Sequence, residues 1–336
     1  MEKNIKQVVF VIIGTMIGAG FASGQEIYLF FFSHGLKGII GILISCLFMG
    51  VVIYKTLKIV NENELDNYKD FLGYIFVKFK TPINFVINTF ILISFFIMIA
   101  GFGAYVNQEF GINSQIGSFI LSFICFIVFM TNMKGIVKIN EILVPILVFF
   151  LIIIGVISLK EVKIFELYNY IITKNTSNFI FQAILYSSYN SILLIPVLIT
   201  LKQLINKKQE ILKISIISAI VMFGLSIIIY FILVRVDVDI TKLEMPAVYV
   251  VSHISLFLKY IYGFIILSSI FTTSISLGNS FLQNICKNKK SYPHFAIIMC
   301  ITAIAICKFG FSNLVSFLYP IFGYLGLIQI YVIFNK

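Results

Sequence analysis

The chain of 336 residues contains no tryptophan, three histidines and a single arginine, and charged residues make up only 12% of it. The histidines form no metal-ligand cluster, and no phosphate-binding loop of the G-x-x-x-x-G-K-[ST] kind occurs. No nucleophile, base and orienting acid converge in the sequence. We therefore expect neither nucleotide hydrolysis by this chain alone nor an enzyme of any other kind, and we assign no catalytic residues.

Hydrophobic residues make up 60% of the chain, and its mean hydropathy is +1.04. Such a composition is typical of an all-α integral membrane protein. The first apolar run is too long for the core of a signal peptide and has no small-residue cleavage site, so we expect a retained span. The net charge of +11 is explained by lysines at a membrane surface, and we expect no nucleic acid partner.

Ten apolar stretches are each near the ~20 residues with which a helix crosses the hydrocarbon core. They run roughly over residues 8–32, 38–54, 82–106, 114–131, 139–158, 179–201, 212–234, 256–282, 293–308 and 314–334. Lysines favour one side of these spans by about two to one, which places both termini in the cytoplasm of a bacterial cell. We expect a multi-pass protein of the bacterial cytoplasmic membrane.

The mixed segment at about 160–178 divides the spans into two groups of five and could lie along the outer interface as an amphipathic helix. An odd number of spans makes the second group start on the opposite side from the first. We therefore predict one transmembrane transporter domain over 1–336, built from two inverted repeats at about 8–158 and 179–334. In such folds the first span of each repeat is interrupted at corresponding positions.

The first span carries four glycines in the eleven residues from Gly14 to Gly24, followed by Gln25 and Glu26. Glycine leaves helical geometry at low cost, and polar side chains are tolerated in a membrane only inside protein or beside a polar cavity. The sixth span carries six consecutive polar or amphipathic residues, Tyr186 to Ser191. We predict a break in both spans. Two alternatives stay open: close helix packing could explain the glycines, and hydrogen bonds from the serines to their own helix backbone could explain the serines.

Individual side chains in the spans leave alternatives open. Glu26 is the only carboxylate well inside a predicted span and could bind a substrate amine or cation, serve as a proton-linked gate, reach the outer interface, or pair with a lysine such as Lys37. Tyr105 could gate a site or anchor a span end at the interface. The run from Ser268 to Ser276 supplies six hydroxyls in nine residues, which could bind an alkali cation or bond within and between helices.

The string Gly14-Thr-Met-Ile-Gly-Ala-Gly-Phe-Ala-Ser-Gly-Gln-Glu26, which continues into Phe30-Phe31-Phe32 and Gly35-x-x-Gly38, resembles the opening of the uncharacterised YkvI-like bacterial membrane proteins. The order of spans, with Thr272-Thr273 in the eighth, is similar over nearly the whole chain. More loosely, the chain resembles the amino acid–polyamine–organocation superfamily and its LeuT-type fold of ten spans in two intertwined inverted repeats.

This resemblance implies that the first and sixth spans unwind around a substrate and that the third and eighth close the site. It also implies a sodium site in which carbonyls of the first span meet two neighbouring hydroxyls of the eighth. A second sodium site is not apparent, since Met16 and Phe21 occupy the corresponding stretch. The expected sodium ligands are Gly14, Ile17, Ser269, Thr272 and Thr273.

The predicted function is secondary active transport of a small organic solute by alternating access, coupled to a sodium or proton gradient. Free amides at the break attract a carboxylate, so an amino acid or a related amine or zwitterion is the leading substrate. The expected substrate-binding residues are Gly18, Ala19, Gly20, Phe21, Ala22, Ser23, Glu26, Tyr105, Tyr186, Ser187, Ser188, Tyr189, Asn190 and Ser276.

The expected partners are the solute, the coupling cation and the lipid bilayer, and the sequence does not indicate an oligomeric state. We expect no cofactor apart from sodium as a coupling ion. The alternative function is a membrane-embedded sensor or germinant-receptor-like subunit that binds a small molecule without moving it.

Overall fold

A computed structural model describes residues 3–66, 68–76, 80–130, 136–160, 178–205, 207–286 and 291–336, which form helices and no strand. Seven helices in these ranges are long and apolar enough to cross a membrane, and three shorter helices are also apolar. The long ones are α4 (Leu36–Glu62), α6 (Lys80–Phe110), α10 (Phe179–Leu201), α11 (Lys208–Leu233), α13 (Leu256–Ile285), α14 (Tyr292–Ile306, extended by η4, Cys307–Phe309) and α15 (Phe311–Phe334).

The three shorter apolar helices are α1 (Lys3–Met16), α7 (Ser114–Met130) and the part of α8 (Ile136–Lys160) that follows its proline. The fold is therefore that of an all-α multi-pass membrane protein, as predicted. The predicted amphipathic connector at 160–178 lies outside the described residues except at its two ends.

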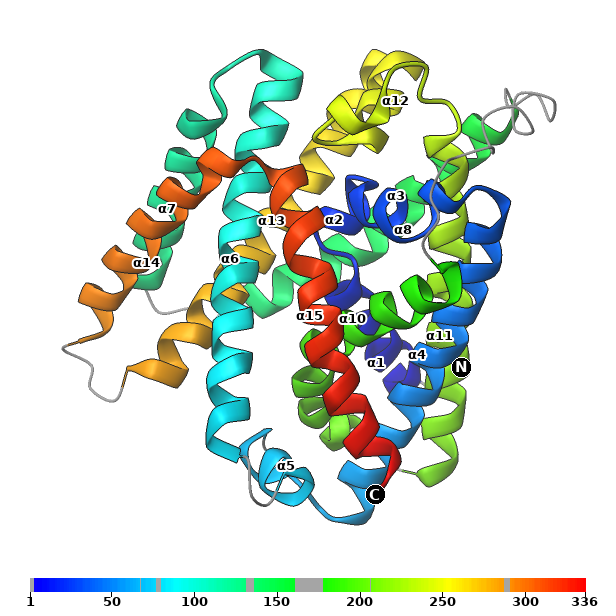
Figure 1. Ribbon diagram of the computed structural model, residues 1–336, viewed down its shortest axis with the longest axis vertical. Helices are drawn as coiled ribbons and strands as arrows, with labels where there is room; N and C mark the ends of the chain where they lie inside the picture. The colour runs from blue at the N-terminus through cyan, green and yellow to red at the C-terminus, as the bar shows by residue number, and fades with distance from the viewer. Residues whose placement is uncertain are drawn as a thin grey trace.

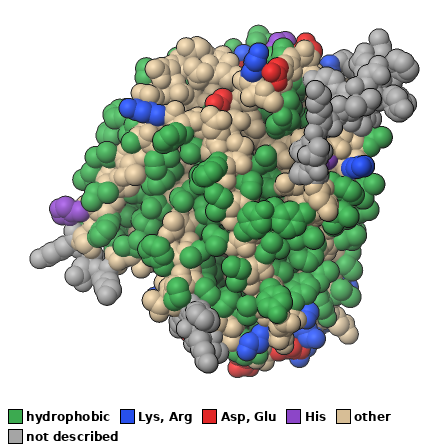
Figure 2. All heavy atoms as spheres, viewed as in Figure 1, with side chains coloured by type: hydrophobic (Ala, Val, Ile, Leu, Met, Phe, Trp, Pro, Cys, Tyr) green, Lys and Arg blue, Asp and Glu red, His purple; other side chains and the backbone are tan. Residues whose placement is uncertain are grey.

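Most of the long helices run between two ends of the molecule (Figure 1). The short helix α5 (Tyr68–Ile75) lies at one end, near the C-terminus, and α12 (Pro246–Ile254) lies at the other. We call these the α5 end and the α12 end. Figure 2 shows hydrophobic side chains over the middle of one face, with Lys, Arg, Asp and Glu gathered toward the two ends. This distribution matches a hydrocarbon layer between two aqueous phases.

The first predicted span is broken, as the glycines indicate. It divides into α1, α2 (Ala19–Ala22), α3 (Gln25–Phe30) and the short turn η1 (Phe32–His34). At the first break the Gly18 N–H donates to the Met16 carbonyl at 3.1 Å instead of continuing the helical pattern to Gly14. At the second break Gly24 has φ of 85°, a left-handed conformation that residues with a side chain rarely adopt.

The predicted break in the sixth span is wrong, because α10 is one continuous helix from Phe179 to Leu201. Its serines donate to backbone carbonyls one turn earlier, Ser187 to Ala183 at 3.0 Å and Ser188 to Ile184 at 2.7 Å. Asn190 donates to the Tyr186 carbonyl in the same way. Back-bonding of this kind satisfies polar side chains without opening the helix.

Neighbouring helices also shield this polar stretch of α10 from lipid. The Ser187 hydroxyl also lies 2.9 Å from the Ser45 carbonyl of α4, so the Ala183 and Ser45 carbonyls share its single proton. On the α15 side, a Cβ at Gly326 would collide with the Ser188 carbonyl, so glycine there permits close contact between the two backbones. The six polar residues are therefore buried within protein, and nothing forces the backbone to unwind.

Candidate functional site

A cavity of about 890 Å³ lies beside the break between α1 and α2 and is walled mainly by α1, α6, α10 and α13. Its size is within the range of pockets that enclose small organic ligands. Predicted site residues that line it are Gly14, Ile17, Gly18, Glu26, Tyr189, Asn190, Ser269, Thr272, Thr273 and Ser276. The structure thus brings all five expected sodium ligands together with part of the expected substrate site.

The other predicted residues do not line this cavity. Ala19, Gly20, Phe21, Ala22, Ser23, Tyr186, Ser187 and Ser188 are buried among the helices around it. Tyr105 is also buried, with its hydroxyl against Gly263 of α13. Because only 3% of its surface is exposed, Tyr105 is not an interface anchor, and it lies on the α12 side of the cavity, consistent with closing it there.

The cavity opens toward the start of α1. Among its lining residues, Phe10 is 41% exposed, and Ser276 and Ser280 on the later part of α13 are also exposed. At its other extreme, Glu26, Tyr189 and Tyr319 are buried. The exposed lining residues therefore gather at one end of the cavity, and the break in the first span forms its inner wall.

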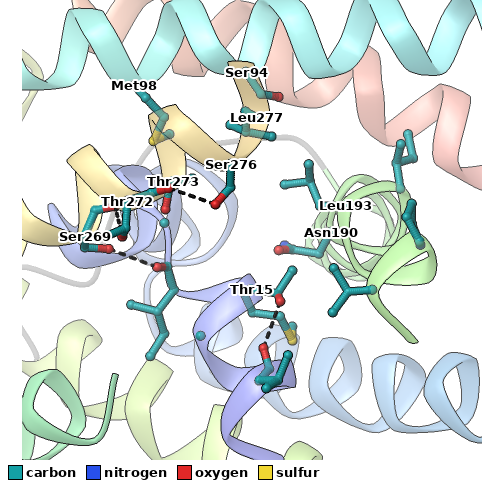
Figure 3. Close-up of a pocket in the computed structure, with 18 of the residues that line it drawn as sticks. Thr15, Ser94, Met98, Asn190, Leu193, Ser269, Thr272, Thr273, Ser276 and Leu277 are labelled. Atoms are coloured by element: carbon teal, nitrogen blue, oxygen red, sulfur yellow. Dashed lines mark hydrogen bonds between the residues drawn. The ribbon is translucent and has the colours of Figure 1, made fainter. Parts of the chain in front are cut away.

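Oxygen atoms gather where α13 faces this break (Figure 3). Ser269 donates to the Ile17 carbonyl at 3.4 Å, and Thr272 donates to the Ser269 carbonyl at 3.1 Å. The carbonyl of Gly14 lies outside the helical hydrogen-bond pattern because the Gly18 N–H bonds to Met16. Carbonyls and hydroxyls together are a suitable ligand set for a hard cation such as sodium.

Asn190 and Ser276 extend the polar lining across the cavity. Figure 3 shows Asn190 on α10 directed into the cavity and Ser276 on the opposite wall, where its hydroxyl donates to the Thr272 carbonyl at 2.9 Å. Asn190 keeps its amide oxygen free for other partners, since its amide nitrogen donates to the Tyr186 carbonyl. Neutral acceptors and donors of this kind fix the orientation of a polar ligand.

Glu26 is buried and belongs to α3, beyond the break. It accepts a hydrogen bond from the Tyr189 hydroxyl of α10, and the Phe21 amide lies near the same carboxyl group. A Cβ at Gly20 would collide with its Oε1 atom. Glu26 therefore neither reaches the interface nor pairs with Lys37, and the carboxyl group lies against the interrupted backbone.

Aromatic rings surround this carboxyl group. The ring of Tyr189 stacks on Tyr319 of α15, with centroids 4.6 Å apart, and on Phe30, with centroids 5.7 Å apart. Tyr186 meets Tyr189 edge to face at 5.5 Å. Packing of this kind holds each ring in place, so the hydroxyl that bonds Glu26 is held in a fixed position.

The α12 side of the site is held shut by residues 239–247, which contain η3 (Ile240–Lys242) and the first two residues of α12 and are called the loop 239–247 here. Gln25 donates to the carbonyls of Leu243 and Glu244 at 2.6 and 3.0 Å. Gln108 of α6 exchanges two hydrogen bonds with the Met245 backbone. The loop therefore connects the broken helix to α6 through the side chains of Gln25 and Gln108.

Two residues of the site carry no signal that sequence reasoning could use. Ser94 of α6 lines the cavity, is 3% exposed, and its hydroxyl has no hydrogen-bond partner among the described residues. Tyr319 of α15 lines the cavity beside Tyr189. A lone serine or tyrosine in an apolar span is ordinary, and only the packing of α6 and α15 against the site distinguishes these two.

No family model matches the chain. It is 28% identical over 338 residues to the uncharacterized membrane protein YkvI of Bacillus subtilis, covering 96% of this chain and 93% of that one. It is 25% identical over 330 residues to the uncharacterized protein YyaD of the same organism, covering 94% and 92%. The predicted resemblance to YkvI-like proteins is confirmed. The similarity spans both halves of the chain.

Solved structures share the fold at low sequence identity. The inward-facing conformation of Mhp1 superposes with a TM-score of 0.68 at 13% identity, covering 95% of this chain and 72% of that one. A Na⁺-coupled sialic acid symporter gives 0.57 at 13% identity, covering 96% and 75%. MhsT in complex with L-phenylalanine gives 0.58 at 14% identity, covering 97% and 87%. The predicted LeuT-type fold agrees with these neighbours.

Proposed function

We propose that the chain is a secondary active transporter that moves a small organic solute by alternating access. The observation that carries this proposal is the cavity at the break of the first span, open toward the α5 end and closed by the loop 239–247 toward the α12 end. A site that one conformation exposes to a single side is what alternating access requires. Neighbours of the same fold include a sodium-coupled symporter, which supports this proposal.

The architecture that we propose for this mechanism has ten spans in two inverted repeats of five. Seven long apolar helices and three shorter ones among the described residues supply this number. The break in the first span agrees with this architecture, whereas the continuous α10 departs from it. In this proposal the solute binds between a flexible, broken first span and a rigid, continuous sixth span.

Both termini are proposed to lie in the cytoplasm, since lysines are more abundant in the segments on that side. The α5 end is then cytoplasmic, and the cavity described above faces the cytoplasm. Solute and coupling ion would leave the protein through the opening between α1 and α13.

Sodium is the proposed coupling ion. Its ligands would be the Gly14 and Ile17 carbonyls with the hydroxyls of α13, Ser269, Thr272 and Thr273, all of which line the cavity. Ion binding at this position joins α1 to α13 across the break, so that sodium favours one conformation over the other. Transport of the solute would then follow the sodium gradient.

The sodium proposal is tested with Thr273→Ala. Removing one neutral oxygen ligand is expected to lower sodium affinity about tenfold or more, measured as the sodium concentration that half-maximally raises Tm of the purified protein. Uptake into proteoliposomes should lose its sodium stimulation in parallel. Thr302→Ala is the matched control, because Thr302 is exposed on α14 and bonds only the Ile298 carbonyl of its own helix.

Equal sodium dependence in wild type and Thr273→Ala would contradict the proposed ion site. If uptake follows a proton gradient and does not depend on sodium, the coupling ion is the proton and not sodium. Solute binding without counterflow in liposomes would contradict transport itself and favour a sensor.

A further inference from the structure

The lining of the cavity carries one charged side chain among the described residues, and that side chain is the carboxyl group of Glu26. The other polar lining groups are amides and hydroxyls, and no described lysine, arginine or histidine faces the cavity. A buried carboxyl group without a cation of its own either takes up a proton or binds a positive partner. None of the ion pairs formed by described residues includes Glu26.

Glu26 also occupies the place where a solute's own carboxylate would be expected. The amides left free by a helix break attract anions, but here the carboxyl group of Glu26 lies against Gly20 and toward the Phe21 amide. The chain therefore supplies the anion for its own interrupted backbone. A second carboxylate brought by a solute would meet like charge in a region of low dielectric constant, where repulsion is strong.

The groups around Glu26 suit an ammonium ion. The Tyr189 hydroxyl uses one acceptor position of the carboxyl group, which leaves others for N–H donors, since an ionised carboxylate has about four such positions. Tyr189 and Tyr319 both line the cavity next to it. Because Phe30 and Tyr319 stack on the ring of Tyr189, a cation would meet the ring of Tyr319, and aromatic faces attract cations most effectively where water is excluded.

We propose that the solute bound in this cavity is an organic amine without a carboxylate, whose ammonium group pairs with Glu26 beside Tyr189 and Tyr319. This inference rests on the proposed function and narrows its substrate class from amino acids and zwitterions to amines. Apolar lining residues such as Met98 and Leu193 would enclose the carbon skeleton. The unpartnered hydroxyl of Ser94 offers a hydrogen bond to a polar group elsewhere on the solute.

The test compares amines with the amino acids that differ from them by the carboxylate alone. Purified wild-type protein is titrated with phenylethylamine and L-phenylalanine, isobutylamine and L-valine, and ethanolamine and L-serine, with Tm as the readout. At least one amine is expected to raise Tm with an affinity about tenfold or more above that of its amino acid. A preference for the amino acids, or no shift with any of the three amines, overturns the inference.

Glu26→Gln provides the second arm, because it keeps the size of the side chain and removes its charge. The loss of a charge-assisted bond is expected to weaken binding of the stabilising amine by about 10- to 100-fold. Equal binding by wild type and Glu26→Gln overturns the pairing and would assign Glu26 to proton transfer instead. Should the variant fold poorly, the comparison of amines with amino acids on wild type still decides.

The two proposals fail in different assays. An amine that binds the purified protein but does not exchange across proteoliposomes supports the amine site and contradicts transport. Exchange of an amino acid in preference to its amine supports transport and contradicts the amine site.

Discussion

At the residue scale, the site depends on one glycine that makes room for one carboxyl group. Gly20 is fully buried in α2, and the Oε1 atom of Glu26 occupies the space where its side chain would start. The same carboxyl group is held from the other side by the Tyr189 hydroxyl. The position of Glu26 is therefore fixed between the broken helix and α10. A substitution in either of these two elements is expected to displace its carboxyl group.

Gly20→Ala tests this arrangement. Because the new methyl group must displace buried Glu26, we expect overpacking to lower the free energy of unfolding by about 1–3 kcal/mol, measured as a lower Tm. Gly224→Ala on α11 is the control, since nothing lies within 4 Å of its Cβ position, and alanine in a helix is expected to be neutral or stabilising. Similar Tm values for both variants would contradict the close approach of Glu26 to Gly20.

Glu26 shows how far single residues can be interpreted from the sequence. Its unusual position inside a span makes it a candidate site residue, but the choice between an interface residue and a buried one depends on Tyr189, which lies 163 positions away along the chain. Thr272 and Thr273 stand out because hydroxyls cluster around them. Ser94 does not stand out in the sequence, because it becomes a candidate site residue only through its position on the surface of α6 that faces the cavity.

At the element scale, the first and sixth spans differ in what their polar residues do to the backbone. Glycines supply the conformations that end α1 and begin α3, including the positive φ of Gly24, and the sequence predicts this break correctly. Serines and asparagine in α10 satisfy themselves on their own helix. Both outcomes are open to a polar stretch in a membrane, and only glycine makes the break inexpensive.

The loop 239–247 acts through a small number of hydrogen bonds, and Gln25→Ala removes two of them. We expect faster amide hydrogen exchange in 239–254, because the segment loses two hydrogen bonds that anchor it to α3 and opens more often, at a cost of about 1–3 kcal/mol in the stability of the closed end. Gln283→Ala is the control, since its amide makes one long bond to Asn279 at an exposed site. Unchanged exchange in this loop would show that Gln25 does not hold the α12 end shut.

At the scale of the whole molecule, the cavity, the charges and the loop define two unlike ends. Charged side chains gather at both ends of the apolar band (Figure 2), but the exposed lining residues of the cavity are Phe10, Ser276 and Ser280, away from the α12 end. Sequence alone predicts the band, because hydropathy and lysine counts depend on composition along the chain. It cannot predict which end is open, because that depends on how the bundle packs in one conformation.

Thiol labelling tests the side to which the cavity opens. In a Cys286→Ser background, where the four remaining cysteines are buried, Ser280→Cys is expected to react with an impermeant reagent in inside-out vesicles and not in right-side-out ones. Lys242→Cys, whose native side chain is 81% exposed near the α12 end, should show the opposite pattern. Reaction of Ser280→Cys from the outside alone would reverse the proposed orientation. Absence of reaction from either side would contradict an open cavity, because exposed Ser280 is one of its lining residues.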